Sequence, residues 1–303
     1  LTQKRSLQLE WLESRLLLSV FTVINTDDHG DGSFRQSILD ANANPGRDFI
    51  DFNIDETGPF AIRPRSPLPT IMDEAVIDGT TQPGFDGPPL IELDGFFTTN
   101  STNGLHVVSG NSVIRGLSIY NFSGSGIYLA LRGGNYIELN YLGIDPAGSQ
   151  GPGNAENGLV IDNSPNNIIG GAFKNVISAN QASGIFVFGS DAVYNVIAGN
   201  YVGVDNSGTY AMPNKVGITI QSPHTLVGDV NHGNVISGNS FAGILMTGEE
   251  ATNNKIQSNW IGTDGTASGA IGNSGSGIEI TAGAHNNRIG SDGDGNYDFL
   301  EGN

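Results

Sequence analysis

Short runs in which apolar residues alternate with other residues recur along most of the chain. The first motif is a glycine followed by an apolar residue, any residue and a second apolar residue. Its copies begin at Gly104, Gly126, Gly158, Gly184, Gly217, Gly243 and Gly277. Their spacings are 22, 32, 26, 33, 26 and 34 residues, so long and short repeats alternate after the first one. Each run has the length and pattern of a short strand with one buried face.

Two further motifs recur in fixed order between the glycine motifs. The second, Asn-x-Ile/Val, is led by Asn111, Asn135, Asn167, Asn195, Thr225, Asn254 and Asn287. The third, Asn-apolar-apolar-Gly/Ser-x-Asp/Asn, is led by Asn140, Asn175, Asn200, Asn234 and Asn259. Three strand-like motifs in each repeat are typical of a parallel β-helix with three strands per coil. Because parallel crossovers are right-handed, we expect an all-β, right-handed parallel β-helix.

The residues before the repeats predict a cap for the open end of this stack. Phe21–Ile24 and Asp48–Ile54 read as strands, and Ser33 with Gln36 forms a capping-box pattern at the start of an amphipathic helix between them. A strand–helix–strand unit would cover exposed core and unpaired strand edges.

The chain therefore divides into three parts by sequence alone. Residues 1–19 form an N-terminal export-associated or helical segment, 20–103 the cap and first irregular coils, and 104–303 the β-helix repeats. The last copy of the third motif stops in the middle of a coil, so we expect the natural chain to continue beyond residue 303 with further domains.

Several segments resemble bacterial right-handed parallel β-helix repeat proteins. The resemblance is carried by Thr22–Asp28, Gly32–Gly46, Val76–Gly84 and the Asn-Val-Ile-Ser-x-Asn copies. Members of that family are parts of large exported or surface proteins, which implies an extracellular or cell-surface location. Arg5–Ser19 also resembles a motif near the start of exported planctomycete proteins; the alternative is an amphipathic helix on the end of the fold. The wider fold includes pectate lyases, alginate epimerases and adhesins, so it implies no single activity.

Composition narrows the possible partners. The chain has 13 basic and 31 acidic residues and a net charge of −18, which argues against nucleic acid or an anionic membrane surface as a partner. It has no cysteine, which excludes disulfides, thiol catalysis and cysteine-ligated zinc. No apolar run approaches 18 residues, so we expect no membrane span. The 44 glycines and 32 asparagines fall between the strand-like runs and mark turns.

Aromatic residues of the third motif are candidate carbohydrate-binding residues. They are Tyr141, Tyr201 and Trp260, which occur in alternate coils. Period-two alternation turns them outward, where their rings can stack on sugars of an extended glycan. The alternative is that the extra residues of the long coils fold over the rings.

The last position of the third motif alternates between Asp and Asn. If these residues stack in one column, Asp145, Asp205 and Asp264 stand about two strand spacings apart, roughly 9.6 Å, too far to share one calcium ion. We expect them to close Asx turns, with calcium bound by single aspartates and loop carbonyls as the alternative. No cofactor is required. The leading asparagines Asn140, Asn175, Asn200, Asn234 and Asn259 should form a structural ladder of amide hydrogen bonds.

Polysaccharide-cleaving β-helices need an acid, a base and a charge stabiliser on neighbouring coils. The outward column of the first motif offers only His106 beside Tyr128, and no other catalytic or metal-binding motif is present. Lys174, Lys215 and Lys255 are scattered singly along the sequence, which does not favour a polyanionic sugar unless calcium bridges it.

The favoured function is a non-catalytic β-helix segment of a large exported bacterial protein, for surface display, adhesion or contact with an extracellular polysaccharide or cell-surface glycan. One alternative is a polysaccharide lyase or a glycoside hydrolase or epimerase acting on an extracellular glycan. A purely structural spacer is the other.

Overall fold

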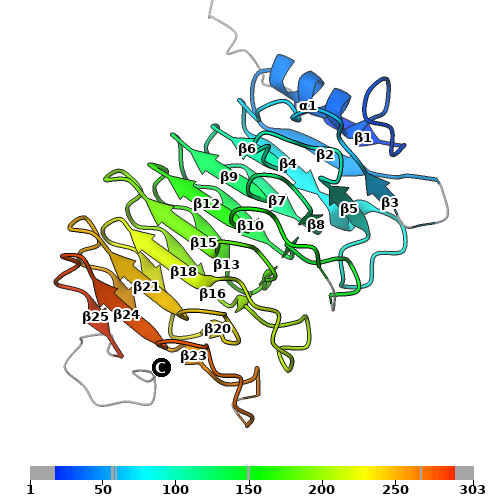
Figure 1. The fold of residues 1–303 in the computed structure, drawn as a ribbon. Helices are drawn as coiled ribbons and strands as arrows, with labels where there is room; N and C mark the ends of the chain where they lie inside the picture. The colour runs from blue at the N-terminus through cyan, green and yellow to red at the C-terminus, as the bar shows by residue number, and fades with distance from the viewer. Residues whose placement is uncertain (1–17, 56–57, 59, 149–150, 267, 291–303) are drawn as a thin grey trace, which may run out of the picture.

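The chain winds into a right-handed parallel β-helix of about nine turns, as the repeats predict (Figure 1). The computed structural model describes residues 18–55, 58, 60–148, 151–266 and 268–290. Residues 5–17 of the export-associated motif and the last copy of the third motif lie outside these residues. All strand pairs among the named strands are parallel, and each strand inside a sheet pairs with its equivalents in the preceding and following coils.

Each of the three motifs supplies the later strands of one sheet, and the strands of the cap and first coils begin sheets A and B. Sheet A, from the second motif, holds β1 (Val20–Val23), β2 (Asp48–Phe52), β4 (Ala75–Asp78), β7 (Val113–Arg115), β10 (Tyr136–Glu138), β13 (Ile168–Gly170), β16 (Val196–Ala198), β19 (Leu226–Val227), β22 (Lys255–Ile256) and β25 (Arg288–Ile289). Sheet B, from the third motif, holds β3 (Phe60–Ile62), β5 (Ile91–Asp94), β8 (Leu117–Tyr120), β11 (Tyr141–Leu142), β14 (Val176–Ile177), β17 (Tyr201–Val202), β20 (Val235–Ile236) and β23 (Trp260–Ile261). Sheet C, from the first motif, holds β6 (Leu105–Val107), β9 (Ile127–Ala130), β12 (Leu159–Asp162), β15 (Ser183–Phe188), β18 (Val216–Gln221), β21 (Ile244–Thr247) and β24 (Ile278–Thr281).

The predicted strand–helix–strand cap is confirmed. Helix α1 (Phe34–Ala43) lies between β1 and β2 at the N-terminal end of the stack (Figure 1). The Ser33 hydroxyl accepts a hydrogen bond from the Gln36 backbone N–H at 3.2 Å, which satisfies a donor that the first turn leaves open. The Phe34 ring lies 5.5 Å from that of Phe52, so the helix closes the core of the first coil.

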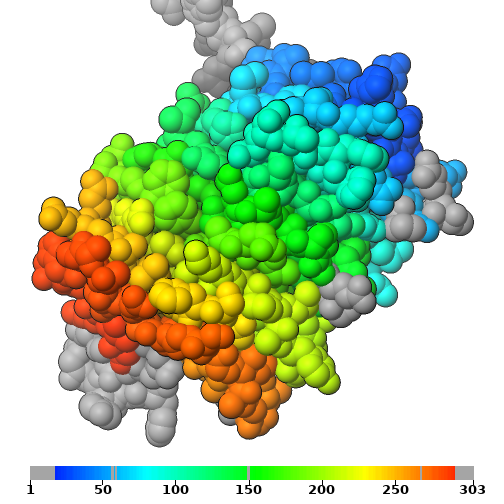
Figure 2. All heavy atoms as spheres, in the orientation of Figure 1, coloured from blue at the N-terminus to red at the C-terminus, as the bar shows by residue number. Residues whose placement is uncertain are grey.

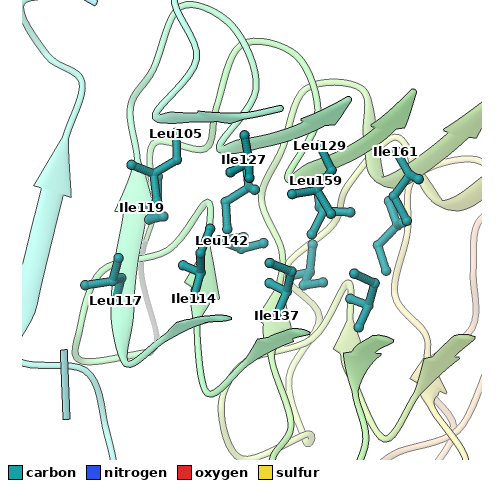
Figure 3. Close-up of a cluster of buried hydrophobic side chains, with 14 of the residues drawn as sticks. Leu105, Ile114, Leu117, Ile119, Ile127, Leu129, Ile137, Leu142, Leu159 and Ile161 are labelled. Atoms are coloured by element: carbon teal, nitrogen blue, oxygen red, sulfur yellow. The ribbon is translucent and has the colours of Figure 1, made fainter. Parts of the chain in front are cut away.

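Apolar side chains from the three sheets fill the interior in straight rows (Figure 3). In sheet C, Leu105, Ile127 and Leu159 occupy the same register in successive coils and are all buried. One coil cannot cover its own apolar face, so stacking is what removes these side chains from water.

Buried asparagines form a hydrogen-bonded ladder at each of the three corners. The predicted ladder, before sheet B, is confirmed: its Nδ2-to-Oδ1 distances run from 2.8 to 3.2 Å along Asn140, Asn175, Asn200, Asn234 and Asn259. A second ladder precedes sheet A and contains Asn135, Asn167 and Asn195, then Asn254 and Asn287. A third precedes sheet C and contains Asn154, Asn180, Asn214, Asn239 and Asn273.

The third ladder corrects the expected column of alternating Asp and Asn. Asn180 bonds Asn154 and Asn214 rather than stacking on Asp145 or Asp205. The aspartates stand at the start of loops inserted in the long coils, and the chain returns to the ladder only when the loop is complete. An alignment of the motif copies by their first residue therefore places Asp145 and Asp205 in one column with Asn180. In space, the inserted loops separate these aspartates from Asn180.

We predict that Asn200→Ala lowers the free energy of unfolding by about 3 kcal/mol, because it leaves buried amide groups without partners. Asn200 accepts the Nδ2 hydrogen bond of Asn175 and donates to Asn234 and to the Ile169 carbonyl. Denaturant unfolding measures the loss. Asn53→Ala is the matched control, since Asn53 is exposed; an equal loss in both variants would refute the role of the ladder.

Candidate functional site

The coils carry their extra residues at two different corners. Long coils insert a loop between sheets B and C, for instance at residues 203–215 between β17 and β18. Short coils instead lengthen the corner between sheets A and B, at residues 171–175 and 228–234. Two protruding loops therefore flank the tight corner at Gly199, and a second tight corner, at Ser258, follows the second loop.

A hollow of about 570 Å³ lies at these corners, and we call it the corner hollow. Its apolar lining includes Phe173, Val230 and Trp260, all of which expose large side chains. Its polar lining includes Lys174, Asp229, Asn231 and His232. A concave site with a few aromatic or apolar groups and convergent polar groups is the usual form of a small-molecule or sugar site.

Local hydrogen bonds hold the polar residues of the corner hollow in place. The Asp229 carboxylate accepts the backbone N–H groups of Asn231 and His232, each at 2.7 Å, and its Oδ1 lies 3.3 Å from the His232 ring. The His232 carbonyl accepts the Gly199 N–H at 2.9 Å, which ties the loop to the neighbouring coil. Lys174 Nζ lies 3.8 Å from the centre of the Tyr201 ring, and burial lowers the pKa of this lysine.

The three predicted sugar-stacking aromatics have different surroundings. Tyr141 is only 8% exposed and packs against Ile144 and Val176, so the expectation of an outward row of three exposed rings is wrong. Tyr201 is half-buried beneath Lys174. Trp260 is 46% exposed and lines the corner hollow. One member of the predicted set therefore presents a ring to a hollow.

The inserted loops of the long coils account for the burial of Tyr141. These loops contact one another across the short coil between them: the Asn206 N–H donates to the Gly148 carbonyl at 3.0 Å and the Gly265 N–H to the Gly208 carbonyl at 2.8 Å. The loops after β17 and β23, yellow-green and orange in Figure 2, project from the same edge of the molecule. Loop packing, which was the alternative interpretation, covers the first ring of the set.

The candidate calcium residues lie on these loops. The Asp205 carboxylate accepts the Ser207 hydroxyl at 2.7 Å and the backbone N–H groups of Thr209 and Tyr210 at 2.9 and 3.0 Å. Asp264 makes the same kind of turn with Thr266 and Ser268. Asp145 begins the equivalent loop and its carbonyl accepts the Gly148 N–H.

In these turns the carboxylate oxygens of Asp205 and Asp264, which calcium would need as ligands, already accept hydrogen bonds. No group of three or more acidic or histidine side chains within the described ranges is arranged to hold a metal ion. Calcium at single aspartates stays a prediction.

A polar cluster that sequence reasoning found only in part lies on the outer face of sheet C. The His106 and Tyr128 rings meet edge to face with their centres 5.4 Å apart, and the Tyr128 hydroxyl donates to Asp162 at 2.8 Å. Burial lowers the pKa of His106, against the charge of Asp162, while burial and the bond to Asp162 raise the pKa of Tyr128. Asp162 is a diagonal neighbour on the next strand, two residues beyond the column that the sequence singled out.

Comparison with known proteins supports the architecture only. No protein-family model and no curated protein matches the chain. Among solved structures, the A-module of mannuronan C-5 epimerase AlgE4 from Azotobacter vinelandii has a TM-score of 0.56 at 15% identity, over 86% of this chain and 73% of that one. An alginate lyase from Paenibacillus sp. str. FPU-7 has a TM-score of 0.48 at 18% identity, over 80% of this chain and 75% of that one. At such identities the first likeness shows a shared parallel β-helix fold, and a shared fold does not fix an activity.

The sequence predicts that no segment spans a membrane. Within the residues that the structure describes, no helix has the length and apolar character needed to cross a bilayer.

The hydrogen bonds of the Asp205 carboxylate should make the stability of the protein depend on pH. Although burial alone would raise it, the hydrogen bonds from Ser207, Tyr210 and Thr209 hold the pKa of Asp205 below the ordinary value of 3.8. A depressed folded-state pKa stabilises the protein above the unfolded-state pKa, and this contribution is lost as pH falls through the folded-state value.

We therefore expect Asp205→Asn to lower Tm at pH 7 and to have progressively less effect below pH 3.8. Thermal melts of both proteins across this range measure the difference, with exposed Asp191→Asn as the control. A difference that is independent of pH would contradict the role of the carboxylate.

Proposed function

We propose that this chain is a non-catalytic β-helix segment of an exported bacterial protein that contacts an extracellular polysaccharide or cell-surface glycan through the corner hollow. The observation that carries the proposal is the exposed Trp260 ring beside fixed polar groups in that hollow. Surface display or adhesion is the role that this contact would serve.

The chemistry of the corner hollow suits a sugar. A pyranose ring has an apolar face that packs on an aromatic ring and a polar rim of hydroxyls that form hydrogen bonds. Trp260 and Phe173 supply apolar faces, and Asp229, Asn231 and His232 supply acceptors and donors around them. Because backbone N–H groups fix the Asp229 carboxylate, little side-chain freedom is lost when a sugar binds.

An extracellular or cell-surface location is part of the proposal. The resemblance of the chain to exported β-helix repeat proteins supports it.

We predict that Trp260→Ala weakens glycan binding at least tenfold, because the variant loses the ring face on which a sugar packs. A glycan array, with and without calcium, identifies the sugar, and calorimetry then measures its Kd. Tyr210→Ala is the matched control, because Tyr210 is 73% exposed on an inserted loop outside the corner hollow. Equal binding by the wild type and Trp260→Ala would contradict the proposal, and so would equal weakening in both variants.

A polysaccharide-cleaving or epimerising enzyme is the second candidate function, and the cluster on sheet C favours it. The lowered pKa of His106, caused by burial, leaves a neutral imidazole at pH 7 that can accept a proton. Tyr128 stays protonated beside it and can donate one. Against this function, the cluster contains no Arg or Lys to neutralise a uronate, and it lies outside the corner hollow.

Product analysis separates the two functions. We expect no reducing ends, unsaturated sugars or epimerised residues from glycans incubated with the protein. The enzyme candidate instead predicts product formation that falls by about 10²–10⁴-fold in Tyr128→Phe, which removes one proton donor and little volume. Product release by the wild type that Tyr128→Phe abolishes would overturn the non-catalytic part of the proposal.

A further inference from the structure

A second aromatic hollow lies at the other edge of the strands that carry the corner hollow. It measures about 320 Å³ and lies where sheet C turns into sheet A, so we call it the opposite hollow. Its lining includes Tyr194, Val196, His224, Leu226 and Lys255. Tyr194 is 59% exposed, and its ring stacks on that of His224 with their centres 5.2 Å apart and their planes 22° from parallel.

The two rings stand at positions where the fold favours other residues. In every coil from β7 to β25, the residue before the ladder position of sheet A has a positive φ. These residues are Asn111, Gly134, Asn166, Tyr194, His224, Asn253 and Asn286. Gly and Asn adopt this left-handed conformation readily and His is tolerated there, whereas it strains a bulky residue such as Tyr.

Tyr194 (φ 58°) and His224 (φ 59°) are the exceptions in this column, and they are adjacent. Tyr194 is kept in a strained conformation, and such residues cluster at functional sites. Their backbones are fixed as well, since the Tyr194 N–H donates to the His224 carbonyl at 3.1 Å and the His224 N–H to the Thr252 carbonyl at 3.0 Å. The turn therefore holds a rigid pair of rings at the surface, which gives a platform that loses little freedom on binding.

The two hollows share one floor. Strands β16, β19 and β22 begin at the opposite hollow, at Val196, Leu226 and Lys255, and end beside the corner hollow, at Gly199 and Ser258. Tyr194 and Gly199 are five residues apart and lie on either side of β16, so these two residues are separated by at most about 16 Å. Loops rise on the corner side, whereas the floor itself exposes Val196 and Leu226 in part, together with Lys255.

We propose that a single polysaccharide chain crosses sheet A and places one sugar on the Tyr194–His224 platform and another against Trp260. This inference rests on the proposed function and adds to it a second subsite and a direction for the glycan. The polysaccharide is expected to be uncharged. The turns before β16 and β22 carry three exposed acidic residues, Asp191, Glu249 and Glu250, which would repel a polyuronate.

We expect the affinity of the protein for an oligosaccharide to increase with the length of the oligosaccharide. A disaccharide reaches one hollow, whereas an octasaccharide reaches both, and engaging a second subsite on the same molecule raises affinity through effective concentration. Calorimetry with neutral gluco- and manno-oligosaccharides, from di- to octasaccharide, should give at least a tenfold lower Kd for the octasaccharide. Hexuronate oligosaccharides of the same lengths should bind more weakly.

The substitutions Tyr194→Asn and His224→Asn test the platform without a risk to folding, because Asn is what neighbouring coils carry at this position. In the double variant we expect the octasaccharide Kd to rise to that of the disaccharide while Tm stays the same or increases. Tyr136→Ala, an exposed tyrosine on β10 of the same sheet, is the control and should leave the length dependence intact.

The outcomes separate this inference from the proposed function. Length dependence that survives in the double variant, or tighter binding of the hexuronates, overturns the inference, while Trp260-dependent binding of the disaccharide would leave the proposed function standing. A fall in Tm in the double variant would show that the rings serve folding and would overturn the platform. If no oligosaccharide binds the wild type, both proposals fail.

Discussion

The requirement that every buried asparagine amide find its partners in the next coil governs this structure. Three corner ladders run along the axis, and a residue such as Asn200 bonds the coil before it, the coil after it and a nearby carbonyl. An amide left unpaired in such a place would cost more than its bonds contribute when made. The ladders therefore fix where each coil turns, and the apolar rows between them follow at the strand spacing.

Because the ladders fix the position of each corner, the length of the chain can vary only in the segment between a strand and the next ladder residue. Insertions consequently alternate: long coils extend the corner between sheets B and C, and short coils extend the corner between sheets A and B. The first kind of insertion packs into a second layer that covers Tyr141. The second kind leaves gaps, and the corner hollow is such a gap, with Trp260 and Phe173 in its lining. The proposed binding surface is thus a consequence of the ladder register.

The repeat pattern was enough to predict the fold, the cap and the ladder that begins with Asn140, because apolar alternation and Asn recurrence are local signals. It failed where insertions intervene. Asn154 was missed because its motif partner lies beyond a loop of variable length. An Asn three or four residues before each leading glycine from Gly158 to Gly277 marks that ladder. The burial of Tyr141 and the meeting of Tyr128 with Asp162 depend on contacts between coils, which no single-coil pattern contains.

The central claim is that a glycan lies across sheet A, supported at its two edges by aromatic rings. A crystal structure of the protein with a bound octasaccharide tests this claim most directly. We expect sugar density that crosses β16, β19 and β22, with one ring on Tyr194 and another on Trp260. Density over His106 and Tyr128 on sheet C, with both sheet A hollows empty, would contradict it.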